Sequence, residues 1–169
     1  EARPIIFIVG APLAIGTAIY TAFLFGQAEG RDLWQSPLLP PHLLIQAFMV
    51  GAASLLLLGT VLQMNTQLIT LAQTTLFVAL GCDLFMIIFG EFGMPHASEA
   101  AAQAATSICR GKYKWLYWGG CIGVGHLLAA LLLFLGGPVA AIAASLATIG
   151  GLYCFEHAFV MAPQEVPNS

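Results

Sequence analysis

The sequence predicts an all-α integral membrane protein, a bundle of about five transmembrane helices with one short surface helix. Of its 169 residues, 59% are hydrophobic and only 8% are charged, and the mean hydropathy is +0.89. A soluble domain carries roughly 25% charged residues, so this chain cannot cover a water-facing surface. Five apolar stretches are each long enough to cross about 30 Å of hydrocarbon as a helix. We therefore expect residues 1–169 to form a single transmembrane bundle.

The five predicted spans are separated by polar or helix-breaking segments. We place the spans at about 4–26, 41–63, 68–90, 115–135 and 139–162. The breaks between them are residues 27–40, 64–67, 91–114 and 136–138. Short connections such as 136–138 force the two helices that they join to be antiparallel neighbours.

The third break contains the predicted surface helix, in the stretch "HASEAAAQAATSICRGK". Ser98 and Glu99 are helix start signals, and Arg110 and Gly111 are stop signals. The polar positions of this helix fall on most of its faces. We therefore expect a short helix lying on the protein rather than a sixth span.

An odd number of spans puts the two chain ends on opposite sides of the membrane. We call the B side the one that carries the 27–40 and 91–114 loops and the C-terminus. Four of the five basic residues lie on the B side and Arg3 lies opposite; the four are Arg31, Arg110, Lys112 and Lys114. The positive-inside rule then makes the B side, and with it the C-terminus, cytoplasmic.

Composition also excludes several classes of partner and cofactor. A net charge of −3 is too small to indicate nucleic acid as a partner, so membrane lipid is the expected surroundings. The four cysteines form no CxxC pair, and clustered thiolates are what an Fe–S cluster or a structural zinc needs. We predict no metal site in this chain.

The fourth span opens with the glycine-rich stretch "GGCIGVGH". Gly119 and Gly123 have the GxxxG spacing that lets two helix backbones approach closely in lipid, and Gly125 adds another bare position. Room for a cofactor or a quinone ring is the functional alternative. Close helix packing is the preferred interpretation.

Ionisable residues inside the spans gather in the B half of the predicted bundle. Because charged groups in spans are costly and face protein or water, we interpret them as a hydrated path from the B surface. The candidate proton-path residues are Asp83, His126, Glu91, Glu156 and His157. His42 and Gln46 are i and i+4 on one helix face and are weaker candidates for lining a cavity or touching quinone.

Two other interpretations of these polar residues stay open. Three of them can serve only to form hydrogen bonds between helices, each of which would stabilise the bundle by roughly 0.6–2 kcal/mol; the three are Gln46, His126 and His157. A b-type haem would need two imidazoles at matching depth on facing helices. His126 and His157 match poorly in depth, and His42 and His157 match better but lie near the surface. No residue is assigned a catalytic role.

Three stretches resemble the polysulfide-reductase-type (NrfD-like) membrane subunits. "GRDLWQSPLLPPHLLIQAFMVGAASLLL" resembles the family's signature of an aromatic loop, a Pro-Leu-Leu-Pro turn and a small-residue helix. "SICRGKYKWLYWGGCIGVGHLLAALLL" resembles its segment in which a basic loop leads into an aromatic, glycine-rich helix. "EHAFVMAPQEVPNS" resembles its C-terminal helix and tail. Because family members usually have eight or more spans, the resemblance implies that this chain is the C-terminal portion of a longer subunit.

The resemblance implies a function at the level of a complex. Such subunits exchange electrons between menaquinone or ubiquinone and an Fe–S partner, which is linked to a molybdopterin or cytochrome subunit. The expectation is therefore a non-catalytic membrane subunit of a respiratory or photosynthetic quinone oxidoreductase, without haem or Fe–S of its own, in a bacterial inner membrane. In such subunits the quinone head group is bound mainly by residues of the first helix bundle, so the resemblance implies no quinone ligands in this chain. The alternatives are a haem-b membrane anchor and a structural or assembly subunit with no redox role.

Overall fold

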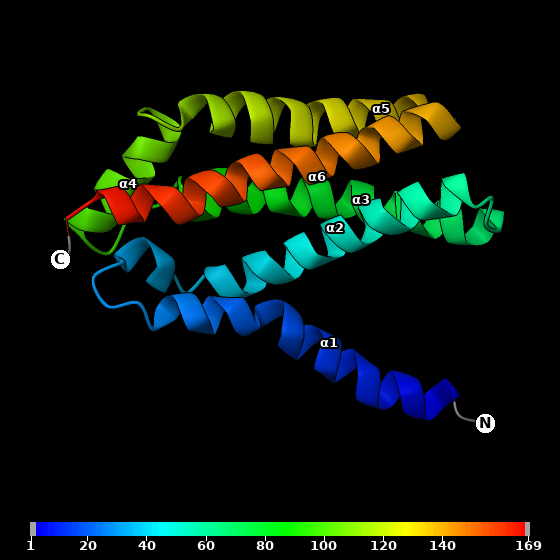
Figure 1. Ribbon diagram of the computed structural model, residues 1–169, viewed down its shortest axis with the longest axis horizontal. Helices are drawn as coiled ribbons and strands as arrows, with labels where there is room; N and C mark the ends of the chain where they lie inside the picture. The colour runs from blue at the N-terminus through cyan, green and yellow to red at the C-terminus, as the bar shows by residue number, and fades with distance from the viewer. Residues whose placement is uncertain (1–2, 168–169) are drawn as a thin grey trace.

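The computed structural model describes residues 3–167, and in them five long apolar helices run roughly along one axis (Figure 1). The helices long and apolar enough to cross a membrane are Pro4–Gly26, Leu39–Val61, Thr66–Glu91, Leu116–Leu135 and Pro138–Glu165. The five predicted spans are confirmed, with boundaries shifted by at most three residues.

The elements follow one another with short connections. In chain order they are α1 (Arg3–Gly26), η1 (Asp32–Gln35), α2 (Leu39–Val61), α3 (Thr66–Phe85), η2 (Met86–Glu91), α4 (Glu99–Cys109), η3 (Leu116–Leu128), α5 (Ala129–Leu135), α6 (Pro138–Met161) and η4 (Ala162–Glu165). The segments η1 and η4 are 3-10 helices, whereas η2 and η3 are π-helical. Thus two of the five spans continue from α- into π-helical geometry or the reverse.

Local sequence signals explain where several helices begin and end. Prolines occupy the first turn of both α2 and α6, where the missing N–H costs nothing. The Asn65 side chain caps α3 by accepting a hydrogen bond from the Leu68 N–H at 2.8 Å. Gly136 and Gly137 separate α5 from α6 with φ values of +73° and +87°, a region that glycine adopts without strain.

The bundle proper is formed by α2, α3, α6 and the η3–α5 helix, and α1 packs mainly on α2. Figure 1 shows α1 diverging from the other helices toward its N-terminal end. Most side chains of α1 are exposed, among them Ile5, Phe7 and Leu13. An apolar exterior of this kind suits a lipid environment, in which exposed hydrophobic side chains carry no penalty.

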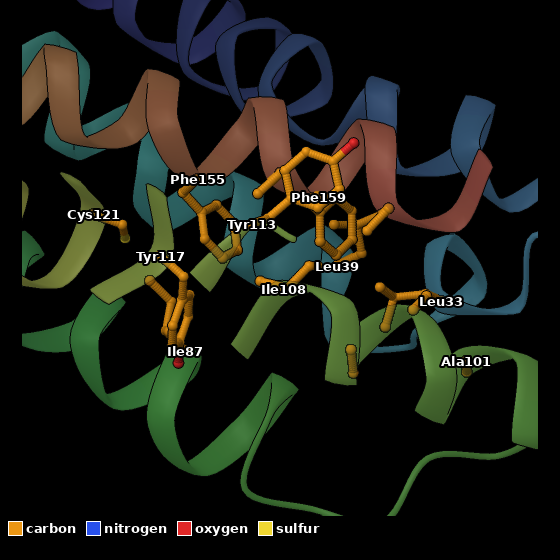
Figure 2. Packing of buried hydrophobic residues seen from close by; sticks show 14 of the residues in the cluster. Leu33, Leu39, Ile87, Ala101, Ile108, Tyr113, Tyr117, Cys121, Phe155 and Phe159 are labelled. Atoms are coloured by element: carbon orange, nitrogen blue, oxygen red, sulfur yellow. The ribbon is translucent and has the colours of Figure 1, made fainter. Parts of the chain in front are cut away.

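Two clusters of buried apolar side chains form the interior. Figure 2 shows part of the first, which includes Leu33 of η1 and Ala101 of α4 and gathers Phe155 and Phe159 of α6 with Tyr113, Cys121 and Leu39. The second lies between α2, α3, α5 and α6 and includes Met49, Leu56, Leu76 and Leu80. Tyr117, in the Trp115–Trp118 aromatic group, belongs to the first cluster and is only 2% exposed.

The short surface helix is confirmed as α4, but its polar residues are not spread over most faces as we expected. Ala101, Ala104, Ala105 and Ile108 form one buried face at helical spacing. This face packs against η1, η3 and η4. Small alanine side chains let the helix lie close to the bundle. Because alanine is only weakly hydrophobic, the buried face of such a helix is hard to recognise from sequence.

The glycine packing is also found, but at other positions than the GxxxG pair. A Cβ on Gly119 would meet nothing within 4 Å, and one on Gly123 would meet only the Trp118 carbonyl of its own helix. The close contacts with α6 are made by Gly125, which packs against Gly151, and by Gly120. The Cys154 side chain occupies the space that a Cβ on Gly120 would need. A π turn holds more residues than an α turn, so residues five apart lie closer to one face than they would in an α-helix, and Gly120 and Gly125 both face α6.

The first B-side loop is anchored to the C-terminal end of α6 by side-chain hydrogen bonds. Arg31 donates from its guanidinium to the Pro163 and Val166 carbonyl oxygens, both at 2.9 Å. Trp34 donates from its indole N–H to the Phe159 carbonyl at 3.0 Å. These contacts connect residues more than 120 positions apart and hold η1 beside η4.

Replacing Arg31 with Met should therefore loosen the B-side end of the bundle. Hydrogen bonds to charged donors contribute roughly 1.5–3 kcal/mol, so we expect a loss of about 2 kcal/mol in stability. The measurement is the thermal midpoint of the detergent-solubilised protein. The control is Arg110→Met, because Arg110 is exposed; equal midpoints for the two variants would contradict this anchoring role.

Candidate functional site

The interior holds a cluster of five buried polar side chains contributed by three spans. His42 and Gln46 lie on α2, Asp83 on α3, Glu91 at the end of η2 and His126 on η3. Each is between 0% and 4% exposed. We call these residues the His–Asp cluster.

Asp83 is the centre of the cluster because both of its carboxylate oxygens face a histidine. Asp83 Oδ2 lies 2.9 Å from His126 Nε2, and Asp83 Oδ1 lies 3.0 Å from His42 Nε2. The first contact has the geometry of a hydrogen bond. The second contact is almost as short, but its atoms are not aligned for a hydrogen bond, so Oδ1 has no hydrogen-bond partner. A fully buried carboxylate is retained only when such partners compensate for its lost hydration.

The proton positions on the His126 side follow from its partners. His126 Nδ1 lies 2.9 Å from the Cys121 carbonyl oxygen, which can only accept, so Nδ1 carries a proton. The contact between Nε2 and Asp83 Oδ2 then needs one more proton, on either the imidazole or the carboxyl group. Asp83 and His126 therefore share a proton that can lie on either partner.

His42 has two possible partners at one nitrogen and none at the other. Its Nε2 lies near Asp83 Oδ1 and also 3.2 Å from Gln46 Nε2. If the ring is protonated, Nε2 forms an ion pair with Asp83 Oδ1; if Nε2 carries no proton, it accepts from the Gln46 amide. His42 Nδ1 is buried without a hydrogen-bond partner, and the nearest carboxylate oxygen, Glu91 Oε1, is 3.8 Å away. The ring thus stands between two carboxylates.

The π-helical segment η2 explains how Asp83 and Glu91 both face His42. Eight residues of α-helix would leave the two side chains roughly 80° apart around the axis. A π turn holds more residues than an α turn, so each residue of η2 advances by a smaller angle. Glu91 is thereby rotated toward the side of the helix on which Asp83 lies.

The structure places the two remaining candidate residues differently. Glu156 of α6 is partly buried and interacts electrostatically with His42 and Asp83 and with the Gln46 side chain. His157 is exposed on the outer side of α6, with its ring 6.2 Å from those of Tyr113 and Tyr153. Of the seven candidates, His157 is the one that the structure leaves apart from the His–Asp cluster.

The histidine geometry also bears on metal binding. Nε2 of His42 and Nε2 of His126 both face the carboxylate of Asp83, so neither nitrogen is directed at a space where haem iron could sit. Within residues 3–167, no group of three or more His, Cys, Asp or Glu side chains is arranged to hold a metal ion. The Nε2 atoms of His42 and His126 are thus engaged by one carboxylate and are not paired across a haem.

Two contributors to the site could not be found from the sequence. Ser36 donates from its hydroxyl to Glu91 Oε1 at 3.5 Å, although it lies in a loop 55 positions away. The Cys121 carbonyl oxygen accepts from the His126 ring within the π-helical segment η3. Neither feature has a local sequence signal, since both depend on how helices continue and where loops fold back.

Five helices long and apolar enough to cross a membrane, three of which bury a His–carboxylate cluster, define the chain as part of a multi-pass membrane protein. Residues 2–166 match the family described as polysulphide reductase, NrfD. The chain belongs to this NrfD family, as the three sequence stretches indicated.

Comparison with curated proteins adds one relative. The C subunit of the selenate reductase of Mesobacillus selenatarsenatis is 28% identical over 172 residues, which cover 97% of this chain and 40% of the relative. The chain thus spans about two fifths of the length of that protein. No solved structure shows significant similarity to the chain.

Proposed function

We propose that this chain belongs to the membrane subunit of a quinone-linked respiratory or photosynthetic oxidoreductase complex and that its His–Asp cluster exchanges protons coupled to the redox reaction. Membership of the NrfD family and similarity to the C subunit of a selenate reductase support the first part. The second part depends on one observation: Asp83 is fully buried between two imidazoles, each within 3.0 Å of its carboxylate oxygens.

Quinone chemistry explains why such a cluster is useful. Reduction of a quinone to its quinol takes up two electrons and two protons, and the reverse reaction releases them. Inside a membrane these protons must travel through groups that change protonation state, and such groups mark proton relays. Carboxylate and imidazole are the side chains best suited to this role.

The His–Asp cluster itself is not proposed as a quinone head-group site. A head group needs hydrogen-bond donors in an open apolar slot, whereas His42, Asp83 and His126 are at most 2% exposed and face one another. We assign the quinone, menaquinone or ubiquinone, to another part of the complex. The role proposed for this chain is to hold and move protons.

The cluster can take up a proton and hold it at His126, by way of three groups in contact. A proton on His42 Nε2 passes to Asp83 Oδ1, and the carboxyl group then offers a proton at Oδ2 to His126 Nε2. His126 Nδ1 keeps its own proton, which it donates to the Cys121 carbonyl. The transferred proton therefore stays on Nε2 of the imidazolium until it returns to Asp83 by the reverse steps. Gln46 supports the step because its amide can donate to His42 Nε2 once that nitrogen has released its proton.

Partners and orientation follow from the same proposal. An Fe–S subunit and a molybdopterin or cytochrome subunit are the partners proposed for the complex. The B-side loops carry Arg31, Arg110, Lys112 and Lys114, which favours a bacterial inner membrane with the C-terminus in the cytoplasm.

The proposed function is tested on the full-length subunit in its own complex. Membranes from cells lacking the subunit should lose quinol-dependent turnover, while the peripheral subunits should still turn over with a soluble redox dye. Loss of both activities, or of neither, would contradict a quinone-linking role. An absorbance spectrum of the purified complex would separately show whether haem accompanies this subunit.

A further inference from the structure

A cavity of about 600 Å³ opens between the first B-side loop, the end of η2 and the start of α4. Its polar lining includes Asp32, Gln35, Ser36, Glu91, His96 and Ser98. The Ser98 hydroxyl donates to the Asp32 carboxylate and so holds the start of α4 to η1. The cavity is therefore a built feature of the B-side loops, lined by groups that bind water.

Glu91 belongs to both this cavity and the His–Asp cluster. Glu91 is one of the residues that line the cavity, although it is only 4% exposed. Its Oε1 accepts a hydrogen bond from Ser36 and lies 3.8 Å from His42 Nδ1. His42 Nδ1 is buried and unpartnered, so Glu91 is the acidic group closest to the free nitrogen of the cluster.

The opposite half of the interior is mainly apolar, with Ser145 and Thr148 as its buried polar side chains. Met49, Leu56 and Leu76 are completely buried between α2, α3 and α6, on the side of the cluster away from the B-side loops. Among the described residues, the buried ionisable side chains are His42, Asp83, Glu91 and His126, so no chain of ionisable groups leads to Asp83 from that side.

We infer that Glu91 is the group through which the buried cluster exchanges protons with B-side water, and that the loop cavity is the mouth of this path. The inference rests on the proposed relay at Asp83 and identifies where that relay meets solvent. Glu91 takes a proton from water in the cavity and passes it to His42 Nδ1. The ring then releases its Nε2 proton to Asp83 Oδ1, and Glu91 is again a carboxylate.

The test compares Glu91→Gln, Glu91→Asp and Glu91→Ala in the assembled complex. We expect Glu91→Gln to slow quinol-linked turnover and dye-detected proton uptake at least tenfold, because the amide cannot carry the proton. Glu91→Asp should keep most of the activity. Formate should restore turnover in Glu91→Ala, since a small weak acid can enter the cavity and replace the missing carboxyl group.

The controls separate this inference from the proposed function. Glu99→Gln removes an exposed carboxylate on α4 and should change neither rate. If Asp83→Asn is slow but Glu91→Gln turns over normally, the relay stands and Glu91 is not its mouth. Slow turnover of Glu91→Ala without formate rescue, in normally assembled complex, would also overturn the inference. If Asp83→Asn is itself unaffected, the relay fails instead.

Discussion

Replacing Asp83 with Asn is expected to reduce quinol-linked turnover of the complex by roughly 10²-fold, the lower range for a lost acid–base group. The amide has nearly the same shape as the carboxyl group but cannot accept a proton from His42 or pass one to His126. Both imidazoles lie within 3.0 Å of this side chain, so the substitution interrupts the relay at its centre. The measurements are steady-state turnover and proton uptake by a pH-indicator dye.

A structural role for Asp83 predicts a different result. The carboxylate would then only hold helices together through hydrogen bonds. Its loss would lower the amount of assembled complex without changing the turnover rate of each assembled complex. Rates are therefore normalised to complex that has assembled. Asp83→Asn with full turnover and full proton uptake per complex would refute the relay.

Replacing Gly151 with Ala is expected to give the largest loss of stability, about 3 kcal/mol or more, as overpacking against a rigid neighbour does. An ideal Cβ at Gly151 would lie 2.2 Å from Gly125 Cα and 3.0 Å from the Gly120 carbonyl oxygen. These are backbone atoms, so relief requires α6 and η3 to move apart. The displacement would also carry His126 away from Asp83.

The neighbouring glycine provides a matched control. A Cβ at Gly150 would meet nothing within 4 Å, so Gly150→Ala should leave stability unchanged or raise it slightly through helix propensity. Thermal midpoints of the two variants in detergent give the comparison. Similar midpoints for Gly151→Ala and Gly150→Ala would show that η3 and α6 are not in this close contact.

The positions of the spans could be predicted from sequence because hydrocarbon thickness and backbone hydrogen bonding constrain them directly. A membrane helix needs about 20 apolar residues, and the chain contains five such stretches. The ends were equally clear, since prolines, Asn65 and the 136–138 turn act locally. Recognition of the NrfD family was possible for the same reason, because its motifs are continuous in sequence.

The depth of the ionisable residues along their spans predicted where most of the candidate site lies. It could not predict which of these side chains contact one another. Counting residues along each span put Asp83, His126 and Glu91 in the B half. The same count included His157 among the candidates, because depth along a helix does not tell which side of that helix faces inward. In the structure His157 lies on the outer side of α6 and Glu156 on the inner side.

The sequence by itself determined the membrane bundle, its family and the half of the membrane in which the ionisable groups gather. Only the tertiary structure decided which groups touch: Asp83 between His42 and His126, Glu91 at a loop cavity, and Gly125 against Gly151. The physical reason lies in the two π-helical segments. A π turn changes the angle between successive side chains, so the face on which Glu91, His126 or Gly125 lies cannot be counted from α-helical periodicity.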